Sequence, residues 1–78
     1  MGMLMQALAD DKFEAGEKVV VDTDMARAKR LQLNHGDWVS GMEAYLGMEG
    51  TVQESPGAGV FRVKFKDGQT LTWNGDLL

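Results

Sequence analysis

The feature that most constrains the fold is a regular alternation of apolar and polar residues near the C-terminus. Phe61, Val63 and Phe65 alternate with basic residues, and Leu71 and Trp73 alternate with threonines after an Asp-Gly turn signal. Strict alternation is typical of a strand that buries one face. The segment therefore predicts an antiparallel β-hairpin, with these five side chains forming the centre of a core.

The register of this hairpin follows from the need to bury those side chains together. A two-residue loop would put Leu71 and Trp73 on the opposite face from the apolar residues of the preceding strand. A three-residue loop, closed by Gly68 in the left-handed conformation, puts them on the same face. We therefore predict that Val63 opposes Leu71 and that Phe61 opposes Trp73, next to a G1-type bulge at Gly68. Trp73 is assigned to the core.

Helices are expected in the long stretch that precedes this hairpin. Val19-Val20-Val21 predicts a first strand, and the acidic residues that follow it can cap a helix that stops at Asn34-His35-Gly36. A second helix is expected from Asp37 to Gly47, with an apolar face formed by Trp38, Met42, Tyr45 and Leu46. Residues 48–54 predict a further strand, and 55–59 a turn.

Together these elements predict a mainly β fold: a small SH3-like barrel of five short strands, with two short helices in the long loop after the first strand. The chain of 78 residues is long enough for one domain, which we place at 16–78. Residues 1–15 form a separate N-terminal segment, rich in Met. This segment is either a tail or a short helix that docks on the domain or on a partner.

Composition excludes several classes of protein. The net charge is −4 and the basic residues are scattered, which argues against binding to nucleic acid or to an anionic membrane. No apolar run approaches the roughly 18 residues of a membrane span, and the N-terminus lacks the pattern of a signal peptide. A soluble cytoplasmic protein is therefore expected.

The sequence offers little for catalysis. Its one histidine, His35, lies near Asp37 and Ser40, but three such residues within six positions are not the pattern of a catalytic triad. With one histidine and no cysteine, a metal site is not expected. Asp22-Thr23-Asp24 resembles the start of a calcium loop, but the twelfth position holds Leu33 where a glutamate is required. We expect no enzyme activity and no cofactor.

The pattern from 32 to 74 resembles the SH3-like repeats of the Mind bomb class of E3 ubiquitin ligases. The matching residues are Gln32, His35-Gly36, Trp38, Met42, Leu46-Gly47, Gly50, Val52, Val63, Phe65, Asp67-Gly68, Leu71, Trp73 and Asn74. The resemblance extends over residues 16–78, and the chain departs from it at Gly75, where the family commonly has Pro. It implies a module that recognises short peptide segments within a larger, ubiquitin ligase-associated assembly. The chain contains no RING or ankyrin sequence, so we do not expect it to be a ligase itself.

A non-catalytic protein–protein interaction module that binds a short peptide is therefore the favoured function. Trp38 and Tyr45 would supply apolar contact, and Arg27, Arg30 or Lys64 would select charge. The alternative is a structural domain that packs on neighbouring domains or self-associates through its Met-rich N-terminus. The partner is expected to be a protein or peptide, and the sequence leaves the oligomeric state open.

Overall fold

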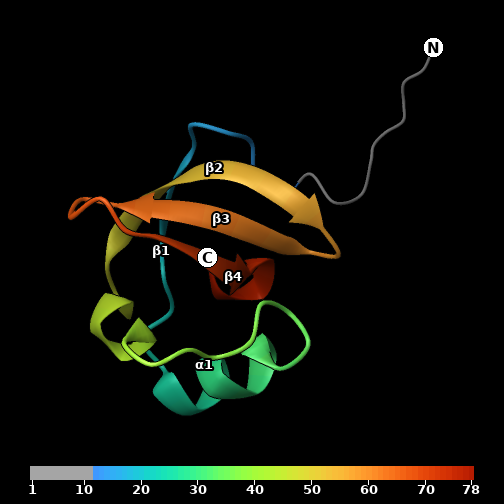
Figure 1. The fold of residues 1–78 in the computed structure, drawn as a ribbon, viewed down its shortest axis with the longest axis vertical. Helices are drawn as coiled ribbons and strands as arrows, with labels where there is room; N and C mark the ends of the chain where they lie inside the picture. The colour runs from blue at the N-terminus through green and yellow to red at the C-terminus, as the bar shows by residue number, and fades with distance from the viewer. Residues whose placement is uncertain (1–11) are drawn as a thin grey trace.

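A computed structural model describes residues 12–78 and shows an antiparallel sheet with a helix-bearing loop packed beneath it (Figure 1). The four strands are β1 (Lys18–Val20), β2 (Glu49–Gly57), β3 (Val60–Phe65) and β4 (Thr70–Asn74), and they lie side by side in the order of the chain. Helix α1 (Met25–Gln32) and the 3-10 turn η2 (Met42–Tyr45) lie between β1 and β2, and the 3-10 turn η3 (Gly75–Leu77) follows β4. The Met-rich segment lies mostly outside the described residues.

The β3–β4 hairpin has the predicted register. Phe61 pairs with Trp73, and Val63 pairs with Leu71. The loop is closed by hydrogen bonds from the Phe65 N–H to the Gln69 carbonyl at 2.8 Å and from the Gly68 N–H to the Phe65 carbonyl at 2.9 Å. Gly68 has a φ of 91°, as a left-handed bulge residue requires.

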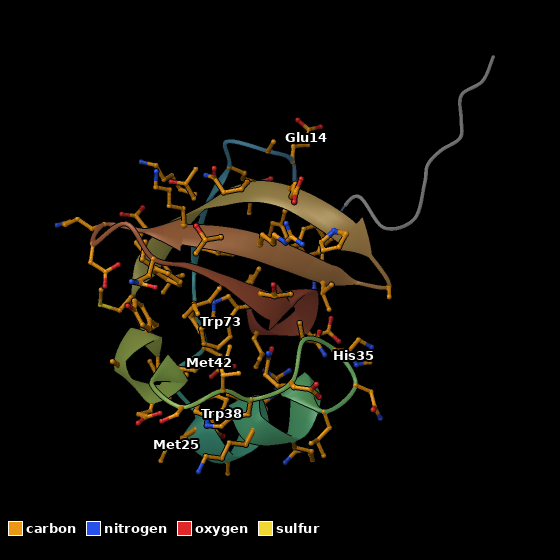
Figure 2. All side chains as sticks on the ribbon, viewed as in Figure 1. Glu14, Met25, His35, Trp38, Met42 and Trp73 are labelled. Carbon is orange, nitrogen blue, oxygen red and sulfur yellow. The ribbon has the colours of Figure 1, made fainter. Side chains whose placement is uncertain are left out.

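The core lies between the inner face of the sheet and the loop that carries α1. Trp73, Phe61 and Val63 are almost fully buried, and Met42 and Ala28 cover them from the loop side. Figure 2 shows Trp73 and Met42 between the sheet and α1. The assignment of Trp73 to the core is confirmed.

The β2–β3 connection is tighter than the predicted turn over 55–59. Strand β2 continues to Gly57, which pairs with Val60, so only Ala58 and Gly59 form the loop. Both have positive φ, 57° and 76°, as in the two-residue turns that suit the twist of a hairpin. Pro56 is accommodated because the pairing shifts register between Glu54 and Gly57.

The first predicted helix is confirmed and the second is wrong. Asp24 caps α1 by accepting a hydrogen bond from the Arg27 N–H at 3.1 Å. Beyond α1, Asp37 and Gly41 have φ values of 61° and 101°. A left-handed residue at each of these positions interrupts a helix, so only the single turn η2 forms.

The sheet is open, which corrects the prediction of a five-stranded closed barrel. Within residues 12–78 no fifth strand pairs with β1, because the chain turns into η3 directly after β4. The nearest approach to closure is a hydrogen bond of 2.7 Å from the Asp22 N–H, just after β1, to the Leu77 carbonyl. The mainly β, SH3-like plan holds, with β1 and β4 as the two edges.

Candidate functional site

A surface hollow lies between the end of α1, the β2–β3 turn and η3. We call it the α1–η3 pocket, and its volume is about 470 Å³. Its walls are formed by Leu31, Leu33, Phe61, Gly59, Asn74 and Gly75, and its rim by Lys12, Arg30, His35 and Asp76. A volume of this size is typical of pockets that hold small ligands or a few side chains.

The walls of the pocket are largely apolar. Phe61 is almost fully buried, Leu31 is half-buried, and Leu33 is 62% exposed. Gly75 packs closely against Phe61, since a Cβ built on this residue would lie 2.8 Å from the Phe61 ring. Because Phe61 is almost fully buried, an apolar side chain of a ligand would meet mainly leucine surface here.

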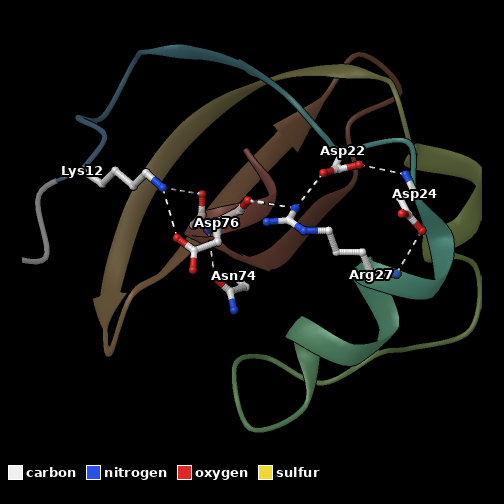
Figure 3. Close-up of polar contacts among 7 residues, drawn as sticks. Lys12, Asp22, Asp24, Arg27, Asn74 and Asp76 are labelled. Atoms are coloured by element: carbon white, nitrogen blue, oxygen red, sulfur yellow. Dashed lines mark hydrogen bonds and ion pairs between the residues drawn. The ribbon is translucent and has the colours of Figure 1, made fainter.

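The rim carries an excess of positive charge. The Lys12 ammonium lies 3.2 Å from the Asp76 carboxylate and 3.4 Å from the Gly75 carbonyl, so its charge is compensated (Figure 3). The Arg30 guanidinium has no carboxylate partner within residues 12–78. His35 places its Nδ1 atom 3.2 Å from the Leu33 carbonyl. Arg30 is thus the cation that a ligand can use.

A buried amide network holds the walls in place. The Gln32 side chain accepts a hydrogen bond from the Asn74 N–H at 2.7 Å and donates to the carbonyls of Asp37 and Thr72 at 2.8 and 3.1 Å. The Asn74 side chain donates to the Leu31 carbonyl at 2.8 Å and accepts from the Asp76 N–H at 2.8 Å. These bonds join α1 to β4 and η3, so the pocket is formed before any ligand arrives.

Sequence reasoning missed this network. Gln32 was matched only as part of the family pattern, although it is completely buried. One sequence signal could have pointed to Gln32. It lies in the last turn of a predicted helix, where backbone carbonyl groups have no hydrogen-bond partner within the helix.

The structure divides the five predicted peptide-binding residues among several places. Arg30 lines the α1–η3 pocket, and Lys64 lies on the outer face of the sheet. Arg27 forms an ion pair within the domain, since its guanidinium lies 2.7 Å from the Asp22 carboxylate (Figure 3).

The pKa of Asp22 is held below its usual 3.8 mainly by the hydrogen bond from the Asp24 N–H, and Arg27 contributes to the same shift.

Trp38 and Tyr45 pack against the inner face of the sheet. Trp38 meets Trp73 edge to face, with 6.4 Å between ring centroids, and the Lys29 ammonium lies 5.7 Å above its ring. The Tyr45 ring packs against the Phe65 ring at an angle of 43°, with 4.5 Å between ring centroids. Both aromatic side chains are half-buried, so much of their surface is already used in packing.

Tyr45 also forms a hydrogen bond to the β3–β4 turn. Its hydroxyl donates to the Asp67 carboxylate at 2.6 Å. This bond lowers the pKa of Asp67 below 3.8, with help from the Gln69 N–H. It also raises the pKa of Tyr45 above 10.0, because the phenol must keep its proton to donate. The pair therefore fastens η2 to the hairpin.

A second hollow, of about 360 Å³, lies on the outer face of the sheet. We call it the lysine hollow, because its exposed side chains include Lys18, Lys64 and Lys66 along with Glu49 and Gln53, and the half-buried Thr51 also lines it. The strand pairing places Thr51 between Lys18 and Lys64 in one cross-strand row. This face is separated from the α1–η3 pocket by the sheet itself.

Residues 12–78 contain no cluster of three or more His, Cys, Asp or Glu side chains that could hold a metal ion. The Asp37 carboxylate accepts from the Asn34 N–H at 3.4 Å, and the Nδ1 atom of His35 lies 3.2 Å from the Leu33 carbonyl. None of the described helices is both long and apolar enough to cross a membrane.

Residues 12–78 thus form a small open antiparallel sheet backed by a helix-bearing loop, an architecture that is compatible with the SH3-like class of domains. The sequence model of the Mind bomb SH3 repeat domain matches residues 13–78, and the chain belongs to this family. Domains of this type generally mediate protein interactions and are generally not catalytic. A comparison with curated proteins finds no match.

Proposed function

We propose that this domain is a peptide-binding module and that the α1–η3 pocket holds a short segment of a partner protein. The observation that carries the proposal is the pairing, in one preformed hollow, of apolar walls with a cation that has no partner within residues 12–78. Pockets that recognise peptides combine an apolar anchor site with a few charged or polar groups that fix orientation.

The chemistry of the pocket indicates the kind of segment it would take. Leu31 and Leu33 suit an apolar anchor residue, and Arg30 suits a carboxylate close to that anchor. A guanidinium can bind a carboxylate through two parallel hydrogen bonds, which selects for geometry as well as charge. Of the five binding residues expected from the sequence, the proposal keeps Arg30 in this pocket.

The proposal is tested by selecting random 12-residue peptides on the immobilised domain and measuring the enriched peptides by fluorescence anisotropy. Leu33→Ala and Arg30→Glu should each weaken binding by about tenfold, because they remove the apolar wall and reverse the selecting charge. The matched controls are Val39→Ala and Lys29→Glu. Both residues are exposed and lie outside the pocket, so these variants should bind within about twofold of the original.

Two results would contradict the proposal in different ways. If no peptide is enriched above background, the domain is not a module for short peptides. If enriched peptides bind Leu33→Ala and Arg30→Glu as tightly as the original domain, the domain binds peptides elsewhere and the pocket is the wrong site.

A further inference from the structure

The eight basic residues of the chain differ in whether the fold supplies a carboxylate partner. Three form ion pairs, namely Lys12 with Asp76, Arg27 with Asp22 and Arg62 with Glu54. Of the other five, Lys29 lies over Trp38 and Arg30 lines the α1–η3 pocket. The three that remain are the lysines of the lysine hollow, and none has an ion-pair partner among residues 12–78.

The spacing of these lysines concentrates positive charge. Lys18 and Lys64 lie on either side of Thr51 in a cross-strand row, two strand spacings apart. Neighbouring strands are about 4.8 Å apart, so the two backbones are about 10 Å apart, close to one Debye length at moderate salt. Lys66 lines the same hollow, and Glu49 is its one described carboxylate. Repulsion among these ammonium groups is therefore only partly relieved within the fold.

Protection of a sheet edge does not account for this arrangement. Lysines often blunt an exposed edge strand, and this explanation suffices for Lys18 on β1. Lys64 lies on β3, which has β2 on one side and β4 on the other, so it guards no edge. Edge protection therefore explains Lys18 but not Lys64.

We propose that the lysine hollow is a second docking surface, for an acidic segment of a partner protein. Charge complementarity argues for this occupant, because three lysines and one glutamate line one hollow in a chain whose net charge is −4. Thr51 and Gln53 add polar groups that can bond to an extended peptide. This surface lies apart from the α1–η3 pocket and does not depend on the function proposed for it.

Other anionic partners fit this surface less well. Single-stranded nucleic acid is normally bound with aromatic side chains on which bases stack, and the one aromatic residue at this hollow, Phe65, is buried. The overall negative charge also opposes a long polyanion. A planar membrane surface cannot enter a hollow in the way that a peptide chain can.

The test is a titration of the ¹⁵N-labelled protein with a peptide of five Glu-Ser repeats, followed by NMR. We expect amide shifts confined to the β1, β2 and β3 residues around Lys18, Thr51 and Lys64. Binding should weaken roughly tenfold when NaCl is raised from about 50 to about 500 mM, since exposed charges are screened. Matched titrations use ten-residue oligo-dT and vesicles that contain phosphatidylserine.

Charge substitutions give effects of opposite sign on the same surface. Lys64→Gln should weaken peptide binding by about threefold, and the double variant Lys18→Gln/Lys64→Gln by about tenfold, as expected for exposed ion pairs. Glu49→Gln removes the opposing carboxylate and should tighten binding by about twofold. Lys29→Gln, on α1, changes the net charge equally and should leave affinity unaltered.

Four results would overturn this proposal. The first is an absence of saturable shifts with the acidic peptide. The second is tighter binding of oligo-dT or of the vesicles at the same residues. The third is an equal loss of affinity in Lys29→Gln and Lys64→Gln, which would indicate a response to net charge alone. Shifts that map to the α1–η3 pocket would contradict the lysine hollow and leave the pocket proposal standing.

Discussion

At the scale of single residues, the Gln32 side chain takes the place of a neighbouring strand along the edge of β4. It accepts from the Asn74 N–H and donates to the Thr72 carbonyl, as a paired strand would do, and it also donates to the Asp37 carbonyl. Gln32→Leu would keep a side chain of similar size and leave these backbone groups without partners. Each such group costs about 1–3 kcal/mol. We expect the free energy of unfolding to fall by about 2–4 kcal/mol, measured by urea denaturation with tryptophan fluorescence.

The matched control is Gln69→Leu, at an exposed residue beside the β3–β4 turn. It should change the free energy of unfolding by less than about 0.5 kcal/mol, as is usual for exposed sites. A loss below about 1 kcal/mol in Gln32→Leu would mean that water replaces the missing amide, and that the network does not hold the pocket walls.

Gly50 shows why one of the glycines in the family pattern is needed. It is buried in β2 opposite Phe65, and a Cβ at this position would collide with the Val63 side chain and lie 3.1 Å from the Phe65 ring. Gly50→Ala should therefore destabilise the fold by about 1–3 kcal/mol through overpacking. Thermal unfolding followed by circular dichroism would measure this. Gln53→Ala, exposed on the same strand, is the control and should leave the melting temperature nearly unchanged.

How far single residues could be predicted depended on the range of their contacts. Trp73 was assigned correctly to the core, because alternation along its own strand fixes its face. Gln32 bonds to residues up to 42 positions away, and no local pattern encodes such partners. The pocket residues Leu33 and Phe61 likewise meet only after α1 and the hairpin have packed.

At the scale of elements, the bond between Tyr45 and Asp67 fastens η2 to the β3–β4 turn. The depressed pKa of Asp67 contributes stability that is present above pH 3.8 and is lost as the pH falls through the folded-state pKa. The raised pKa of Tyr45 contributes stability that is present below pH 10.0 and is lost as the pH rises through its folded-state value. The Tyr45→Phe variant should therefore be less stable than the original protein between about pH 3.8 and pH 10.0. Below and above this range, the difference in the free energy of unfolding between the two proteins should become smaller.

Two measurements check this prediction. The urea midpoints of both proteins, measured across pH, show over which pH range the Tyr45→Phe variant is less stable than the original protein. NMR titration of the carboxyl groups should show the pKa of Asp67 moving up toward 3.8 in Tyr45→Phe. Asp22 is the internal control, because its pKa is lowered by Asp24 and Arg27, which Tyr45 does not contact. An unchanged Asp67 pKa would show that the hydroxyl does not bind this carboxylate in solution.

The elements differ in how well the sequence predicts them. The β3–β4 hairpin could be predicted down to its bulge, because burying five apolar side chains on one face allows one register. The segment from 37 to 47 has helical spacing, yet it forms only η2, because it carries left-handed residues at Asp37 and Gly41. Asp37 adopts that conformation where its carbonyl accepts from Gln32, a tertiary contact that spacing cannot reveal.

At the scale of the whole molecule, the leucine that stabilises the fold differs from the leucine that we propose contacts a peptide. Leu77 in η3 is 1% exposed and joins the core, and its carbonyl links the C-terminal turn to Asp22 after β1. Leu33 follows α1, is 62% exposed and lines the α1–η3 pocket. The same truncation to alanine should therefore have opposite consequences at the two positions.

Leu77→Ala should lower the free energy of unfolding by about 2–5 kcal/mol, which is a large part of the stability of so small a domain. Leu33→Ala should change it by less than about 0.5 kcal/mol, while binding of the selected peptides weakens about tenfold. Urea denaturation and anisotropy on both variants, at a temperature where Leu77→Ala remains folded, separate the two effects. If the folded fraction of Leu77→Ala binds the peptides normally, the pocket is formed by α1 and β4 without the full packing of η3. If Leu33→Ala instead unfolds the domain, Leu33 belongs to the core, and the apolar wall assigned to the ligand is part of the fold.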